Sequence, residues 1–156
     1  FKGWTGTYEL VFVDDASTDD TWQRIEEAHK VHPQAGGLLH DRNAGQSAAL
    51  WTGIQETQSP FIATLDGDLQ NDPADLIPML AKMDSLDLVC GHRVQRQDSS
   101  VRKLSSRIAH AARKAVLGSA IADTGCAIRV LRRTALEDLF PFNGLHRFLP
   151  ILVQAT

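Results

Sequence analysis

The stretch that decides the fold is Phe61-Ile62-Ala63-Thr64-Leu65-Asp66-Gly67-Asp68-Leu69-Gln70-Asn71-Asp72-Pro73. Its first part is short, apolar and rich in β-branched and aromatic residues, which predicts a buried strand over 61–65. Gly67 and Pro73 mark the turn that follows this strand. Asp66 and Asp68 are therefore expected at the carboxyl end of a strand, the edge at which open α/β sheets bind ligands.

The acid pair suggests a metal site, because two carboxylates one residue apart repel each other and folding alone gains nothing from them. Mg²⁺ or Mn²⁺ prefers few carboxylates together with phosphate oxygens of a substrate. The alternative is an acidic turn with a helix cap, since Asp72-Pro73 opens a helix well. A calcium loop starting at Asp66 is excluded, because its sixth and twelfth places hold Asn71 and Ile77. A phosphatase-type Asp-x-Asp nucleophile stays open.

Composition fits one soluble domain with a core: 156 residues, 43% of them hydrophobic. The net charge of −3 is unevenly distributed. Residues 92–133 hold ten Lys or Arg and two acids, a balance of +8, whereas the remainder has a balance of −11. This pattern favours a partner that carries phosphates and a metal. Nucleic acid is not expected, because the basic block lacks interleaved aromatic residues.

Cys90 and Cys126 lie in apolar contexts without metal-ligand spacing. We interpret them as buried free thiols in a reducing compartment. No stretch reaches the roughly 18 apolar residues of a membrane helix, and no signal peptide is recognised. The chain itself is therefore expected to be soluble and cytoplasmic.

Strand and helix patterns alternate along the chain, which predicts a mostly parallel sheet covered by helices. The predicted strands are 9–13, 38–40, 61–65, 86–91 and 125–131, and the predicted helices run from a Ser17 or Thr18 cap to about 32, then over 46–57, 73–83, 101–117 and 133–139.

The first strand also ends in acids, Asp14 and Asp15. Neighbouring parallel strands would bring Asp14, Asp15, Asp66 and Asp68 to one rim, which indicates a nucleotide and metal site; helix capping is the alternative for Asp14 and Asp15. Arg93 and Arg96 follow strand 86–91 and could clasp phosphate at the same rim, or belong to a solvated loop.

Seven motifs occur in one order, and together they resemble family 2 glycosyltransferases, most closely the dolichol-phosphate mannosyltransferase-like branch. They are Val13-Asp14-Asp15-Ala16-Ser17-Thr18-Asp19-Asp20-Thr21, Arg42-Asn43-Ala44-Gly45-Gln46-Ser47-Ala48-Ala49, Asp66-Gly67-Asp68-Leu69-Gln70-Asn71-Asp72-Pro73, Gly91-His92-Arg93 with Arg96 and Asp98, Ser105-Ser106-Arg107, Asp123-Thr124-Gly125-Cys126 and His146-Arg147-Phe148-Leu149-Pro150.

The resemblance implies a GT-A fold, an inverting single displacement and a nucleotide-diphosphate sugar donor of the GDP-mannose or UDP-glucose type. The implied acceptor is a polyprenyl phosphate at the cytoplasmic membrane face. Asp68 and Gln70, with Asp66 beside them, look like ligands of Mg²⁺ or Mn²⁺, and Asp66 also like a donor contact. The remaining implied residues are Asp14 and Asp15 at the nucleotide and Arg93, Arg107 and Arg147 at phosphates. Asp123 lies in a turn that opens onto strand 125–131, and it is expected to be either a base or orienting group or an ordinary turn acid.

The chain departs from the family pattern because a first strand with a Pro-x-Tyr-Asn-Glu-like motif and the region after His146-Arg147-Phe148 are missing. We therefore expect 1–156 to be a partial GT-A catalytic domain with a gap in its sheet. Strand re-pairing or exchange between two chains of a homodimer would fill the gap, as would a segment upstream. A transferase with a hydroxyl acceptor and a non-catalytic nucleotide-binding module remain alternatives.

Overall fold

The computed structural model describes residues 4–92 and 126–155, and these form two compact units. The N-terminal unit comprises Phe1–Pro60 and Leu139–His146, and the second unit comprises Phe61–Asp138 and Arg147–Thr156. The predicted basic helix 101–117 lies outside the described residues.

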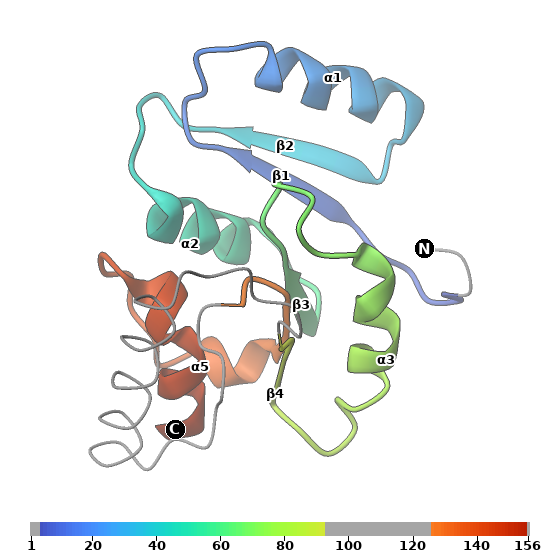
Figure 1. Cartoon of the computed structure of the whole chain (residues 1–156), viewed down its shortest axis with the longest axis vertical. Helices are drawn as coiled ribbons and strands as arrows, with labels where there is room; N and C mark the ends of the chain where they lie inside the picture. The colour runs from blue at the N-terminus through green and yellow to red at the C-terminus, as the bar shows by residue number, and fades with distance from the viewer. Residues whose placement is uncertain (1–3, 93–125, 156) are drawn as a thin grey trace, which may run out of the picture. The chain divides into compact units, whose positions relative to one another are not determined.

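The N-terminal unit is a parallel two-stranded sheet between two helices. Strand β1 (Leu10–Asp14) pairs in parallel with β2 (Ala35–Leu39). Helix α1 (Thr21–Val31) packs mainly on β2, and α2 (Gln46–Glu56) packs on β1 (Figure 1). This β-α-β-α order confirms the α/β prediction for the first part of the chain.

Strand β2 begins three residues earlier than the predicted strand 38–40 and contains Gly36 and Gly37, residues that usually mark a turn. The reason lies in the helix above the strand. A Cβ built on Gly37 would lie 2.6 Å from Cγ2 of Ile25 and 3.0 Å from the ring of Trp22. The missing side chain therefore lets α1 approach β2 closely.

The predicted cap of α1 at Ser17 or Thr18 is wrong, because the helix begins at Thr21 with Asp20 at the N-cap position. Ser17 instead donates its backbone N–H to Oδ1 of Asp14 at 2.8 Å. The segment before α1 is therefore a loop built around Asp14.

The second unit contains β3 (Phe61–Thr64), β4 (Leu88–Cys90) and β5 (Arg129–Arg132) in the order β3-β5-β4. Strand β5 runs antiparallel to both neighbours, so β3 and β4 point the same way. The core of this unit lies between the sheet and the helical segment after β3, and it consists of Leu76, Met79, Met83, Cys126, Ile128 and Val130.

The predicted helix 73–83 is divided into a 3₁₀ turn η1 (Pro73–Asp75) and a short α3 (Leu76–Leu80). Pro78 has no N–H to donate to the carbonyl of Ala74, and it lies in the first turn of α3, where that N–H is not needed. A second 3₁₀ turn, η2 (Arg133–Leu136), follows β5.

Helix α5 (Leu145–Ala155) begins in the N-terminal unit and carries Pro150 in its interior. Among the described residues, no helix combines the length and apolar character that crossing a bilayer requires.

The sheet gap expected from the sequence stays a prediction, and the pairing of β1 bears on it. In the described part of the chain, β1 and β3 belong to different sheets, and only one edge of β1 is paired. The N–H of Leu10 donates to Gln34 O, and the C=O of Asp14 accepts the His40 N–H. Gln34 and His40 directly precede and follow β2, so these groups of β1 point to the edge that β2 covers. In a parallel strand the intervening Val11 and Val13 then point their N–H and C=O groups to the open edge.

Candidate functional site

Asp15 follows β1 and holds the loop that leads into α2. Its Oδ1 accepts a hydrogen bond from the Ala44 amide at 2.8 Å, and its Oδ2 accepts one from the Gly45 amide at 2.7 Å. His40 Nδ1 donates to Oδ1 at 2.8 Å, while its Nε2 lies 2.9 Å from Thr52 Oγ1. The carboxylate therefore joins β1, the end of β2 and the start of α2.

These contacts keep Asp15 ionised. Burial raises the pKa of its carboxyl, but the hydrogen bonds from Ala44, His40 and Gly45 together hold the pKa below its usual value. The main work of Asp15 in the described structure is to fix the loop, and its predicted contact with a nucleotide stays a prediction.

Asp14 has different surroundings, although it is the next residue. Its side chain is buried at 3% exposure, and its Oδ1 accepts the Ser17 amide. Its Oδ2 is buried and has no hydrogen-bond partner in the described structure. A buried acceptor without a donor costs about 1–3 kcal/mol, so Asp14 Oδ2 is suited to a hydrogen bond from a ligand.

The acid-rich turn after β3 lies in the second unit, and Asp66, Asp68 and Gln70 are all exposed there. The Gln70 amide donates to Oδ1 of Asp68 at 3.1 Å. Leu69 between them has φ of +61° and a side chain that is 95% exposed. Left-handed backbone costs a non-glycine residue about 1–2 kcal/mol, which the fixed shape of this turn must offset.

Two contacts anchor the turn. The Cys126 thiol lies 4.0 Å from Asn71 Oδ1, a weak hydrogen bond, and Asp72 Oδ1 accepts the Ala74 amide at 2.9 Å. Asp72 is thus the helix cap that the simpler interpretation of the sequence proposed. Asp66 and Asp68 do not cap this 3₁₀ turn, and Oδ1 of Asp68 accepts the Gln70 amide instead.

The donor set fits a magnesium or manganese ion. Exposed carboxylate and amide oxygens of Asp66, Asp68 and Gln70 are hard ligands at one turn. In the described residues no three His, Cys, Asp or Glu side chains gather as a metal cluster. An ion here would therefore complete its shell with oxygens of water or of substrate phosphate, as Mg²⁺ commonly does.

Several predicted site residues lie elsewhere. Arg93, Arg107 and Asp123 fall outside the described residues. Arg147 is exposed in the first turn of α5. Since the two acid pairs belong to different units, their meeting at one rim also stays a prediction.

Part of the basic block serves structure rather than phosphate binding. Arg129 is buried at 4% exposure in β5. Arg132 pairs with Asp87 at 2.8 Å and lies 5.1 Å from the centre of the Phe61 ring. The charge count from the sequence therefore overstates the basic surface offered to a partner.

Three polar side chains in the N-terminal unit were given no individual role by sequence reasoning, although two of them lie in the quoted motifs: His40, Ser47 and His146. Ser47 Oγ lies 2.7 Å from His146 Nδ1 and accepts the Gly144 amide at 3.0 Å. Isolated histidines and serines carry no spacing signal, so only the folded structure reveals that these residues meet.

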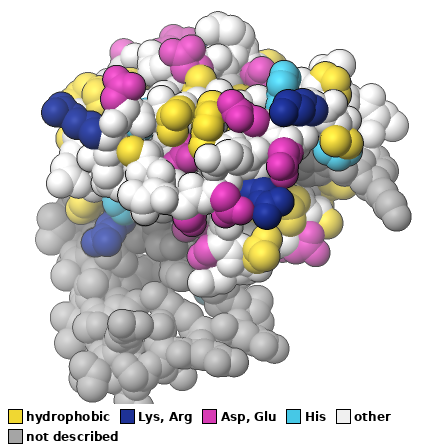
Figure 2. All heavy atoms as spheres, turned by 90° about the horizontal axis from the view of Figure 1, so that it is seen from above, with side chains coloured by type: hydrophobic (Ala, Val, Ile, Leu, Met, Phe, Trp, Pro, Cys, Tyr) yellow, Lys and Arg dark blue, Asp and Glu magenta, His cyan; other side chains and the backbone are white. Residues whose placement is uncertain are grey.

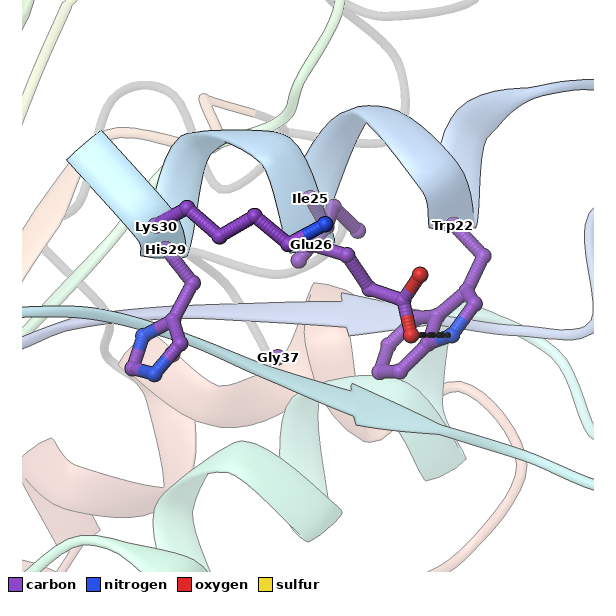
Figure 3. A pocket seen from close by; sticks show the side chains of 7 residues that line it. Trp22, Ile25, Glu26, His29, Lys30 and Gly37 are labelled. Atoms are coloured by element: carbon purple, nitrogen blue, oxygen red, sulfur yellow. Dashed lines mark hydrogen bonds between the residues drawn. The ribbon is translucent and has the colours of Figure 1, made fainter. Parts of the chain in front are cut away.

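A shallow hollow beside α1 is unrelated to the predicted site. Its lining includes Trp22, Ile25, Glu26, His29 and Lys30, which lie along one side of the helix above Gly37 (Figure 3). The Trp22 indole donates to Glu26 at 3.1 Å. Figure 2 shows acidic side chains spread over the face that carries α1, with hydrophobic ones between them. Gly36 and Gly37 of β2 also line the hollow, and none of the predicted site residues does.

The chain matches the model of the family "Glycosyl transferase family 2" over residues 4–140. It is 36% identical over 151 residues to the undecaprenyl-phosphate 4-deoxy-4-formamido-L-arabinose transferase of Pseudomonas fluorescens, covering 95% of this chain and 44% of the relative. It is 36% identical over 156 residues to the dodecaprenyl-phosphate galacturonate synthase of Rhizobium johnstonii, covering 96% and 45%. The chain thus spans about half the length of these curated relatives.

Solved structures share the fold. Glucosyl-3-phosphoglycerate synthase of Mycobacterium tuberculosis, in complex with phosphoglyceric acid, superimposes with a TM-score of 0.69 at 23% identity, covering 94% of this chain and 56% of that one. The same synthase with Mn²⁺, uridine-diphosphate-glucose and phosphoglyceric acid gives a TM-score of 0.67 at 22% identity. The expected GT-A fold is confirmed by these neighbours.

Proposed function

Because this chain belongs to glycosyl transferase family 2, we propose that the whole protein transfers a sugar from a nucleotide-diphosphate donor to a polyprenyl phosphate. The names of both curated relatives, a transferase and a synthase that act on polyprenyl phosphates, support this acceptor. The names of these relatives specify different sugars, a formamido-arabinose and a galacturonate. Our expectation of a mannose or glucose type therefore rests on the sequence motifs alone.

The observation that carries the proposal is the loop after β1. Asp14 offers a buried carboxylate oxygen without a donor, and Asp15 holds the surrounding loop in place. Ribose hydroxyls and base N–H groups are donors of the kind that Asp14 lacks. We assign Asp14 to the nucleotide of the donor and Asp15 to the support of that site.

The turn after β3 is the proposed metal site. Asp68 and Gln70 would hold Mg²⁺ or Mn²⁺, with Asp66 beside them, because all three are exposed oxygen donors on one turn. When bound, such an ion supplies positive charge that stabilises the leaving diphosphate. Asp66, Asp68 and Gln70 orient that charge, and the fixed turn around Leu69 keeps their positions.

Arginines are the proposed phosphate contacts. Arg147 stands in the first turn of α5, where the helix dipole also favours an anion. Arg93 and Arg107 would clasp the other phosphates, and Asp123 would orient the acceptor. An acceptor phosphate is already anionic at neutral pH, so its oxygen attacks the anomeric carbon without a strong base. The bond to the nucleoside diphosphate breaks in the same displacement, with inversion.

The proposed place of action is the cytoplasmic surface of a membrane, because a polyprenyl phosphate resides in a bilayer. The basic block 92–133 would assist binding to anionic headgroups. Neither a hydroxyl acceptor nor a non-catalytic module is favoured by a particular contact.

Calorimetry tests the proposal directly. Titration of the protein with GDP-mannose and UDP-glucose, with and without Mn²⁺, should give metal-dependent binding of at least one donor. Binding without transfer to polyprenyl phosphate would favour a non-catalytic module, and transfer to a sugar hydroxyl would favour the alternative acceptor. Failure to bind any nucleotide sugar would contradict the proposal.

A further inference from the structure

Ser47 connects two segments that lie about a hundred residues apart in the chain. It is the second residue of α2 and is 8% exposed. Its Oγ accepts the Gly144 amide at 3.0 Å and lies 2.7 Å from Nδ1 of His146. No side chain caps α2, so this hydroxyl serves the distant segment rather than its own helix.

The segment that Ser47 contacts has a defined shape. Gly144 has φ of +103°, a conformation that favours glycine, and the Leu145 amide bonds to Phe142 O at 3.1 Å. Leu145 is fully buried at 0% exposure. The turn therefore ends with His146 fixed in the first turn of α5, directly before Arg147.

We propose that Ser47 and His146 are positioning residues that hold Arg147 in place for a substrate phosphate. This inference rests on the proposed function, and neither residue needs to touch the substrate. A guanidinium binds phosphate strongly only when its two N–H donors face the phosphate oxygens. The contacts of Ser47 with Gly144 and His146 fix the backbone that carries the Arg147 side chain. The sequence motif contains Ser47 and His146, but their spacing gives no sign that they meet.

A double-mutant cycle on the intact enzyme separates positioning from simple stability. Ser47→Ala should lower kcat/KM for sugar transfer about tenfold, because misplaced groups lose catalytic efficiency steeply. If Ser47 acts through Arg147, the double variant with Arg147→Ala should be no slower than Arg147→Ala alone. Ser47→Thr, which keeps the hydroxyl, should recover most of the activity.

Thr57→Ala is the matched control. Thr57 bonds through its hydroxyl to Gly53 O and Ile54 O at the other end of α2. Loss of the Thr57 hydroxyl should leave kcat/KM near that of the unmodified enzyme. An equal loss in Ser47→Ala and Thr57→Ala, or multiplying losses with Arg147→Ala, would overturn the positioning role.

Amide exchange checks the contact independently of activity. Ser47→Ala removes the acceptor of the Gly144 amide, so exchange of that amide measured by NMR should accelerate about tenfold or more, whereas Thr57→Ala should not change it. Unchanged exchange would show that the contact is absent. An unmodified enzyme that transfers no sugar would contradict the proposed function instead, and the positioning role would fall with it.

Discussion

Asp14 and Asp15 are neighbours in the sequence, yet their carboxylates have different surroundings. Asp15 receives three donors from the loop and from His40, whereas Asp14 has a buried oxygen without one. At Asp68 a carboxylate remains exposed on a strained turn. The same residue type thus holds a loop in place, keeps a buried oxygen without a hydrogen-bond donor or exposes its carboxylate on a turn, depending on its local contacts.

The lowered pKa of Asp15 leads us to expect that the free energy of unfolding depends on pH. Its pKa in the folded chain is below the value of 3.8 that an ordinary Asp has, so its stabilisation is full above that value and is lost as pH falls through the folded pKa. Asp15→Asn should lower stability at pH 7 and flatten the loss of stability below about pH 4. Urea unfolding at several pH values measures both effects. An acid limb as steep as that of the unmodified protein would contradict the role of Asp15.

Asp14 predicts a loss of nucleotide affinity. Asp14→Asn should weaken binding of a nucleoside diphosphate by about tenfold or more, because a hydrogen bond to a charged acceptor is worth about 1.5–3 kcal/mol. Asp20→Asn serves as the control, since Asp20 is an exposed acid near the same loop. Calorimetry with UDP and GDP should separate the two variants. Equal affinities would remove Asp14 from the nucleotide site.

The elements show where local sequence patterns succeed. The helix over 46–57 and the strand over 61–65 have clear periodicity or apolar character, and both are confirmed to within a residue at either end. Gly36 and Gly37 misled the prediction, because glycine is a turn signal until the packing of α1 on β2 is known. The chain after Pro73 was also misjudged, since the expected helix is divided into η1 and a short α3.

The pair Gly36 and Gly37 supports a matched prediction of stability. Gly37→Ala should lower the free energy of unfolding by about 1–3 kcal/mol, because its Cβ would press against Ile25 and Trp22. Gly36→Ala should be neutral or slightly stabilising, since nothing lies within 4 Å of its Cβ. Thermal unfolding compares the two. Equal stabilities of both variants would contradict the close contact between α1 and β2.

The site was predicted less completely than the fold. Acid pairs at strand ends are visible in the sequence because Asp14, Asp15, Asp66 and Asp68 each follow an apolar run. Which of those acids is internally satisfied depends on loops that arrive from elsewhere, such as the Ala44 and Gly45 amides. The contact of Ser47 with His146 likewise joins distant parts of the chain, and no periodicity in the sequence predicts it.

At the scale of the molecule, the main open question is which strand pairs with the open edge of β1. In the described residues Leu10 and Phe12 are large apolar side chains left 39% and 38% exposed on this strand. An edge that is both unpaired and apolar invites another strand. We propose that a further strand pairs with the open edge of β1. In a sample of the 156-residue chain alone, this strand would come from a second copy of the chain.

Sedimentation of the 156-residue chain tests this proposal. The chain should form a dimer, and Leu10→Lys should dissociate it, because charged edge residues oppose strand pairing. Val31→Lys is the control, as Val31 is apolar and 71% exposed on α1 but away from the edge. A monomer at every concentration would contradict exchange between chains.

The central claim is that the acid turn after β3 supports metal-dependent sugar transfer to a polyprenyl phosphate. The most direct measurement is transfer of labelled sugar from a nucleotide donor into the lipid fraction, with Mn²⁺ varied, for the intact enzyme and its Asp68→Asn and Asp72→Asn variants. Asp72→Asn keeps the helix cap and should retain activity. We predict that Asp68→Asn loses at least about 100-fold, since stabilisation of leaving-group charge is commonly worth that much. Activity of Asp68→Asn equal to that of the unmodified enzyme at every Mn²⁺ concentration would contradict the account.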